Sequence, residues 1–221
     1  MRLPFPFPAG LFRTALLSLL LFSLLLPLAA QGREDNEISL PWFGQLEENW
    51  GSSSLGDSPV IDIAHGGCAL VSTAMVLKHY GVKTDPLKLN KWLLKNGGFD
   101  KGWDDDTGEY LGLVRIIWDI VASGHSEIGV YRRYDFTALP ADLYLIRGYL
   151  DGGIPVIAEV LRPGNIPHFV VLTGYEGDDF LIRDPLDETT RLLSESYRIA
   201  DRHGSGAARN IFGVRIFVPA E

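Results

Sequence analysis

The chain contains very little cysteine and an excess of acid over base. Cys68 is its only cysteine among 221 residues, so no disulfide can form within the chain. Twenty basic residues face 28 acidic ones, for a formal net charge of −8. This charge disfavours nucleic acid and anionic lipid as partners and is better suited to a neutral or cationic substrate. The nucleotide-binding pattern GxxxxGK[ST] is also absent.

No pattern in the sequence indicates a metal or a cofactor. The acidic segment DKGWDDDTG, residues 100–108, lacks the alternating oxygen ligands and distal glutamate of a calcium loop. We therefore expect a solvated loop there, and neither a metal site nor a cofactor in the protein.

Most of the leucine excess lies near the N-terminus. Arg13 precedes an uncharged, leucine-rich run over residues 14–30 that ends in small residues. This pattern predicts a signal peptide over residues 1–32, with a mature N-terminus between Ala30 and Arg33, and a secreted or periplasmic protein. The alternative is an uncleaved anchor, the only case in which we expect a membrane partner. Cleavage would remove two arginines and no acid, which makes the net charge −10.

The cysteine stands at the predicted start of an amphipathic helix. After Gly66 and Gly67, apolar residues recur at helical spacing until Gly81 ends the pattern. Unpaired N–H groups and the helix dipole at this end favour a thiolate at Cys68. The alternative is a small buried hydrophobic residue. A free thiol in an exported protein requires burial, intermolecular pairing or catalysis.

The remaining pattern predicts one α+β domain over residues 40–221, after a linker at residues 33–39. The first half is mostly helical and the second half is rich in valine, isoleucine and phenylalanine, as in an antiparallel sheet. Further helices are predicted over residues 86–95, 110–122 and 140–150, and strands over residues 129–134, 154–161, 168–175, 180–185 and 212–220.

A histidine and an aspartate lie at corresponding ends of two predicted strands. His168 opens HFVVLTGY, and Asp184 closes FLIRDP after a Gly-Asp-Asp turn. If these strands form a hairpin, the imidazole and the carboxylate come together. Cys68, His168 and Asp184 would then supply a nucleophile, a base and an orienting group. Taken singly, the histidine and the aspartate are equally consistent with structural roles.

These segments resemble family thirty-nine of the cysteine peptidases, in particular its secreted stand-alone members. The resemblance rests on GGCALVSTAMVLKHYGVKTDP, LNKWLLKNGGF and HFVVLTGYEGDDFLIRDP, and it covers roughly residues 40–218. It implies a papain-like fold and a Cys-His-Asp arrangement in which Cys68 is the nucleophile, His168 the base and acid, and Asp184 its orienting partner. It also implies that Gln45, in PWFGQLEENWG, binds the oxyanion.

The resemblance has limits in both sequence and function. Family members often have proline and then threonine or serine soon after the cysteine, whereas this chain has Ala69, Leu70 and Val71 before Ser72. We expect this departure to affect packing more than chemistry. The founding members process bacteriocin leaders, but this chain has no nucleotide-binding half, so that substrate does not transfer. The expected activity is hydrolysis of an amide bond in a peptide or protein substrate. Acyl transfer to an amine and a non-catalytic peptide- or cell-wall-binding module are the alternatives.

Overall fold

A computed structural model describes residues 37–197 and 206–221 of the chain. The predicted signal peptide and residues 33–36 of the predicted linker lie outside these ranges, as does His203. Within them, no helix combines the length and apolar character needed to cross a membrane.

The described residues form seven helices and seven strands, with the bounds that follow. The helices are α1 (Ile63–Gly66), α2 (Cys68–His79), α3 (Pro86–Lys95), α4 (Trp118–Ser123), α5 (Leu143–Asp151), α6 (Leu193–Ser196) and α7 (Ala207–Asn210). The strands are β1 (Phe99–Trp103), β2 (Tyr110–Ile116), β3 (Ile128–Asp135), β4 (Val156–Arg162), β5 (Ile166–Glu176), β6 (Asp179–Arg183) and β7 (Gly213–Pro219).

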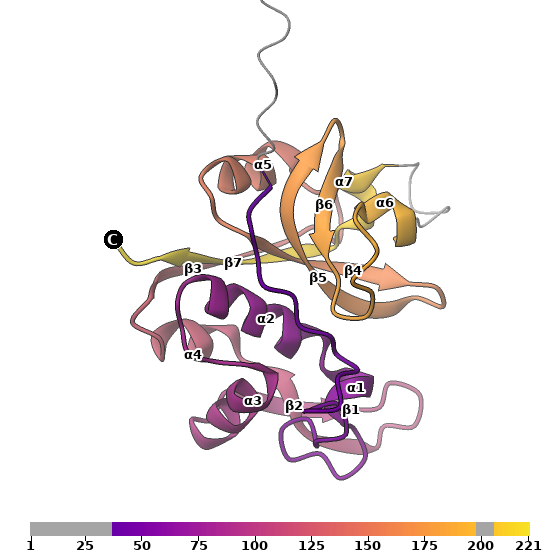
Figure 1. The fold of residues 1–221 in the computed structure, drawn as a ribbon. Helices are drawn as coiled ribbons and strands as arrows, with labels where there is room; N and C mark the ends of the chain where they lie inside the picture. Colours follow the sequence, from indigo (N-terminus) through magenta and orange to yellow (C-terminus); the bar gives the residue numbers. More distant parts are fainter. Residues whose placement is uncertain (1–36, 198–205) are drawn as a thin grey trace, which may run out of the picture. The chain divides into compact units, whose positions relative to one another are not determined.

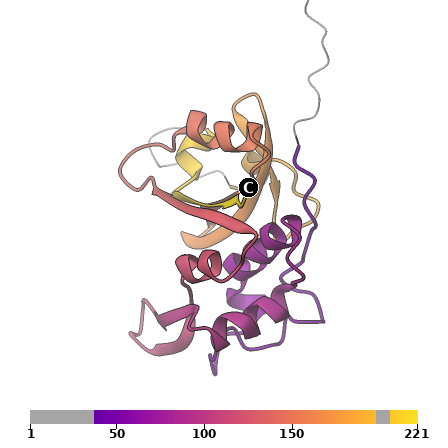
Figure 2. The same ribbon diagram turned by 90° about the vertical axis from the view of Figure 1, so that its left-hand side faces the viewer.

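A five-stranded sheet with the order β3-β7-β4-β5-β6 dominates the second half, and its neighbouring strands are antiparallel. Helices α2, α3 and α4 lie on one side of this sheet and α5 on the other (Figures 1 and 2). The prediction of an α+β fold with N-terminal helices packed on a C-terminal antiparallel sheet is therefore confirmed.

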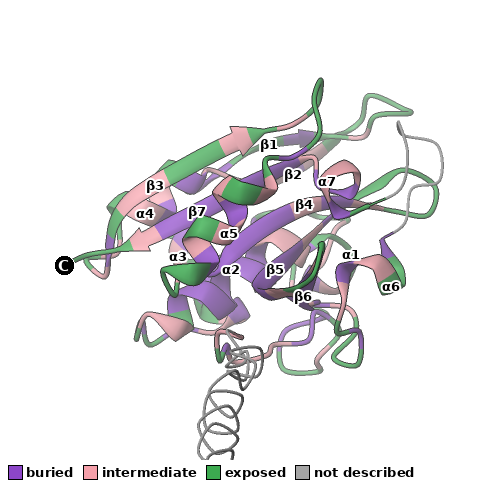
Figure 3. Ribbon diagram, turned by 90° about the horizontal axis from the view of Figure 1, so that it is seen from above, coloured by how far each residue is buried: buried purple, intermediate pink, exposed green. Residues whose placement is uncertain are grey.

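Alternate residues of the central strands enter two apolar cores, one on each face of the sheet. Ile157 and Val171 join the core around α2, whereas Val156 and Leu172 join the core beneath α5. This alternation follows from the two-residue period of a strand. The central strands are buried along most of their length (Figure 3).

Helix α2 is more deeply buried than its amphipathic pattern predicted. We expected one inward face, but residues 70–77 are buried all round. The reason is its position between two layers, because it packs against β5 on one side and α3 on the other. A helix that is apolar all round is typical of such an interior position.

The prediction of a single helix over residues 110–122 is wrong. Its first part is β2, which pairs with β1 of the predicted solvated loop, and only its end is the helix α4. Gly112 has a φ of 103°, which no right-handed helix accommodates, and a Cβ there would lie 2.8 Å from the Ser58 Cα. The acidic segment therefore begins as a strand, and only residues 104–109 connect β1 to β2.

Candidate active site

Cys68 is the first residue of α2, as predicted, and it is half-buried. The short helix α1 leads directly into α2 through Gly67, whose backbone N–H bonds to the Ile63 carbonyl at 2.8 Å. A Cβ at Gly67 would lie 2.5 Å from that same oxygen, so this close approach requires glycine. No side chain caps the start of α2. Its first N–H groups are therefore available to a developing negative charge.

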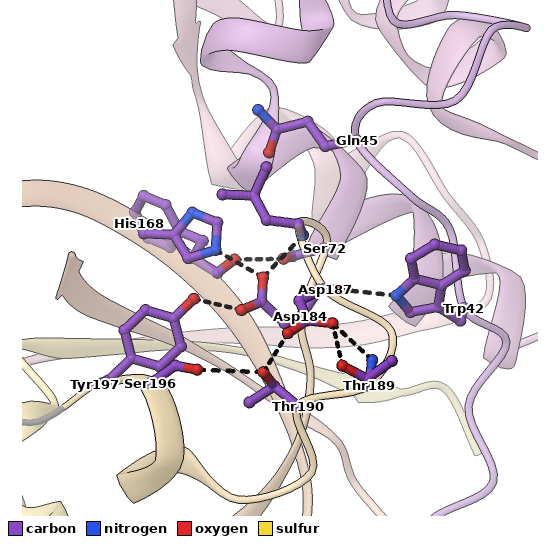
Figure 4. Close-up of polar contacts among 12 residues, drawn as sticks. Trp42, Gln45, Ser72, His168, Asp184, Asp187, Thr189, Thr190, Ser196 and Tyr197 are labelled. Atoms are coloured by element: carbon purple, nitrogen blue, oxygen red, sulfur yellow. Dashed lines mark hydrogen bonds and ion pairs between the residues drawn. The ribbon is translucent and has the colours of Figure 1, made fainter. Parts of the chain in front are cut away.

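The β5–β6 hairpin brings His168 and Asp184 together. Glu176 pairs with Asp179 across the turn, and Val171 pairs with Arg183 at the other end of the ladder. The His168 Nε2–H donates to Asp184 Oδ1 at 2.9 Å, and both side chains are about 2% exposed (Figure 4). This geometry leaves the Nδ1 of the imidazole for the thiol of Cys68.

The surroundings of His168 favour its cationic form. Burial alone lowers the pKa of His168, but hydrogen bonding to Asp184 and Cys68 and the charges of those two groups outweigh it. The net effect raises its pKa from 6.5 to about 9. An imidazole in contact with both a thiol and a carboxylate can therefore hold a proton at neutral pH and stabilise a thiolate beside it.

Tyr197 is a third neighbour of this pair, and the sequence analysis missed it. Its phenol donates a short hydrogen bond to Asp184 Oδ2, and its ring stacks on the imidazole with centroids 5.7 Å apart. The chain reaches this point because it turns back after β6, bridges Leu181 to Leu192 and forms α6 immediately before Tyr197. No spacing or motif in residues 186–197 signals this return.

The backbone also fixes the position of Asp184. The Leu186 N–H donates to Asp184 Oδ1 at 2.9 Å. The Trp42 indole donates to the Asp184 carbonyl at 2.8 Å (Figure 4). The Gln45 N–H bonds to the Pro185 carbonyl at 2.7 Å. The segment before α1 is thus tied directly to the loop that carries the carboxylate.

Gln45 is buried, with 3% of its surface exposed. Its Nε2 donates to the Ala64 carbonyl at 2.7 Å, which anchors the amide to the segment immediately ahead of Cys68. An amide nitrogen carries two N–H groups, so one remains for a ligand. The Gln45 Oε1 is buried without a hydrogen-bond partner in the described part of the chain.

The other histidines of the described residues make contacts away from this cluster. His65 pairs with Asp62 on the surface, His79 bonds to the Ser39 carbonyl and His125 to the Val121 carbonyl. Across residues 37–197 and 206–221, no three histidine, cysteine or acidic side chains gather in a way that would hold a metal ion.

The sequence matches the Peptidase_C39 like family over residues 38–203, most of the chain. The chain belongs to this family. Membership assigns it to the cysteine peptidases and confirms the resemblance to family thirty-nine seen in the sequence. A comparison with curated proteins finds no match.

Solved structures similar to this family member share little sequence with it. A Bacillus anthracis protein described as a C39-like peptidase is 15% identical, with a TM-score of 0.48, over 82% of this chain and 96% of that chain. A double glycine motif protease from an AMS/PCAT transporter, solved with a leader peptide, is 20% identical, with a TM-score of 0.43, over 83% and 94%. The peptidase domain of Streptococcus ComA is 20% identical, with a TM-score of 0.41, over 74% and 97%.

Proposed function

We propose that the protein is a thiol-dependent hydrolase that cleaves an amide bond in a peptide or protein through Cys68, His168 and Asp184. The observation that carries this proposal is the buried imidazole, which bonds to a carboxylate through Nε2 and interacts with the only cysteine of the chain. Such an arrangement activates a sulfur nucleophile and orients its base.

The proposed reaction proceeds in two stages. The Cys68 thiolate attacks the carbonyl carbon, and the Cys68 N–H and the free Gln45 amide N–H stabilise the oxyanion. The His168 imidazolium donates its proton to the leaving nitrogen, which releases an amine and leaves a thioester on Cys68. His168 then takes a proton from water, the hydroxide attacks the thioester, and the carboxylic acid leaves as the Cys68 thiolate and the imidazolium are restored.

Product analysis tests this activity directly. We expect residues 33–221 incubated with a peptide library to yield new N-termini and carboxylates, and Cys68→Ala to yield none, as measured by mass spectrometry. Adding a primary amine separates hydrolysis from transfer, because a transferase would join the amine to the acyl fragment. Binding of a peptide without any product would instead indicate a non-catalytic module.

Asp184→Asn should lower kcat by about 10- to 100-fold, less than Cys68→Ala does. An asparagine oxygen still accepts the His168 Nε2–H but no longer offsets the imidazolium charge. Steady-state kinetics of both variants measures the difference. Asp179→Asn is the matched control, because this carboxylate lies on the same hairpin and accepts the N–H groups of Phe180 and Ser194. A folded Asp184→Asn protein as inactive as Cys68→Ala would show that the charge contributes more than orientation.

We also propose export through the N-terminal segment. The leucine-rich run after Arg13 supports this, and we expect the mature N-terminus between Ala30 and Arg33. N-terminal sequencing of the protein from the medium or periplasm measures the cleavage point. Protein recovered from membranes and still beginning at Met1 would contradict cleavage and support the anchor.

A further inference from the structure

Tyr197 contacts both members of the buried pair. Its hydroxyl bonds to Asp184 Oδ2, whereas His168 bonds to Oδ1, and its ring stacks on the imidazole at an interplanar angle of 23°. The tyrosine is itself buried, with 4% of its surface exposed. A buried side chain that bonds to one member of the pair and stacks on the other restrains both.

From these contacts we infer that Tyr197 is a positioning residue of the reaction, which fixes the Asp184 carboxylate and the His168 ring and sets how much negative charge the imidazolium faces. This inference rests on the proposed function of Cys68, His168 and Asp184. Nothing in the chemistry requires Tyr197 to touch the substrate.

The hydrogen bonds of Asp184 account for both carboxylate oxygens. Oδ1 accepts from His168 and from the Leu186 N–H, and Oδ2 accepts from Tyr197. A buried carboxylate oxygen without a donor is costly. The phenol therefore satisfies Oδ2 and draws part of the negative charge away from His168.

The phenol remains a donor across the working range of pH. Burial, and then the charge of Asp184, raise the pKa of Tyr197 well above its ordinary value. Within residues 37–197 and 206–221, the other titratable or charged groups that act on this cluster are Cys68 from α2 and Arg162 from the end of β4. In the same part of the chain, the phenol of Tyr197 is the donor to Oδ2.

Removal of the hydroxyl should change activity and its pH dependence together. Tyr197→Phe keeps the stacked ring but leaves Oδ2 without its donor, so the carboxylate stabilises the imidazolium more strongly. We expect kcat to fall about tenfold. We also expect the alkaline limit of kcat/KM, set by loss of the His168 imidazolium that protonates the leaving nitrogen, to rise by about half a pH unit or more.

Tyr80→Phe is the matched control. Tyr80 is partly buried and donates to the Phe217 carbonyl at 2.8 Å, and it lies at the opposite end of α2 from Cys68. This variant should lose a comparable hydrogen bond and some stability, with no change in the alkaline limit. In an Asp184→Asn background, Tyr197→Phe should no longer move the limit, because the charge on which it acts is gone.

A substitution-free measurement covers the case in which Tyr197→Phe does not fold. Wild-type protein grown with 3-fluorotyrosine has more acidic phenols and a stronger bond to Oδ2, so the alkaline limit should move downward. An unchanged or oppositely shifted limit in the folded protein would overturn the positioning role, even if kcat fell. A wild-type thiol that never shows imidazolium-dependent reactivity would instead overturn the proposed function, so the two failures are distinguishable.

Discussion

Alkylation of Cys68 by iodoacetamide is expected to be fast well below pH 7 and to slow by about 10²- to 10³-fold at pH 5.5 in His168→Ala. Without an imidazolium partner, an ordinary thiol of pKa ~8.5 is only about one part in a thousand thiolate at this pH. The structure supports the large effect because His168 contacts the thiol and is itself held by Asp184.

The stability of the folded protein should also depend on pH at the alkaline end, in a direction set by His168. Its pKa of about 9 lies above the 6.5 of an unfolded chain, so the folded protein binds this proton more tightly. The resulting stabilisation is fully present below about pH 6.5 and is lost as the pH rises through 9. We therefore expect the free energy of unfolding to decline over that interval, whereas alkylation stays fast because Cys68 remains a thiolate after His168 loses its proton.

His125→Ala serves as the control for this experiment. His125 packs against Trp92 with the two rings tilted by 45° and bonds to the Val121 carbonyl, so its loss should leave the alkylation profile unchanged. A wild-type profile with a midpoint near ~8.5, insensitive to the loss of His168, would contradict the cysteine hydrolase mechanism. It would indicate a thiol that is only a packing residue.

Gln45→Ala is expected to lower kcat by about 10²- to 10³-fold, the usual cost of removing one oxyanion donor. Steady-state kinetics on a peptide substrate measures the loss. The effect on folding should be small, because the amide makes one described hydrogen bond, to the Ala64 carbonyl, and its Oε1 is already without a partner. The loss should appear in kcat more than in KM, since the oxyanion exists only after attack.

Asn90→Ala is a suitable comparison for Gln45→Ala. This buried amide bonds to the Gly56 N–H and the Ser54 carbonyl, and so supports the same segment before α1 without a described bond to His168. It should reduce thermal stability but not the kcat of the folded protein. An unchanged kcat in Gln45→Ala would remove Gln45 from the catalytic machinery.

The hairpin of His168 and Asp184 was predictable because its signals are local. Two apolar runs flank a Gly-Asp-Asp turn, so strand pairing alone places their outer ends together. Cys68 was predictable for a similar reason, since a glycine pair marks the start of a helix. In each case the information lies within about 20 residues of the sequence.

Tyr197 and β2 were not predictable because their positions depend on distant contacts. Tyr197 reaches Asp184 only after the chain has doubled back along β6. In β2, the apolar residues fit a helical period as well as a strand. The Asp57 carboxylate, which accepts the Leu113 N–H at 2.5 Å, helps to hold the extended form. Periodicity carries no information about either interaction.

The hydrogen bonds between the segment before α1 and the loop after β6 can form only late in synthesis. The ribosome makes the Gln45 and Cys68 segments first, whereas the carbonyls of Asp184 and Pro185, which receive Trp42 and the Gln45 backbone, come near the end. For most of translation the nascent Cys68 thiol therefore has no His168 beside it, and the segment before α1 has no Asp184 loop to bind. Under the proposed function, a nascent chain cannot cleave its neighbours until nearly all of it has been synthesised.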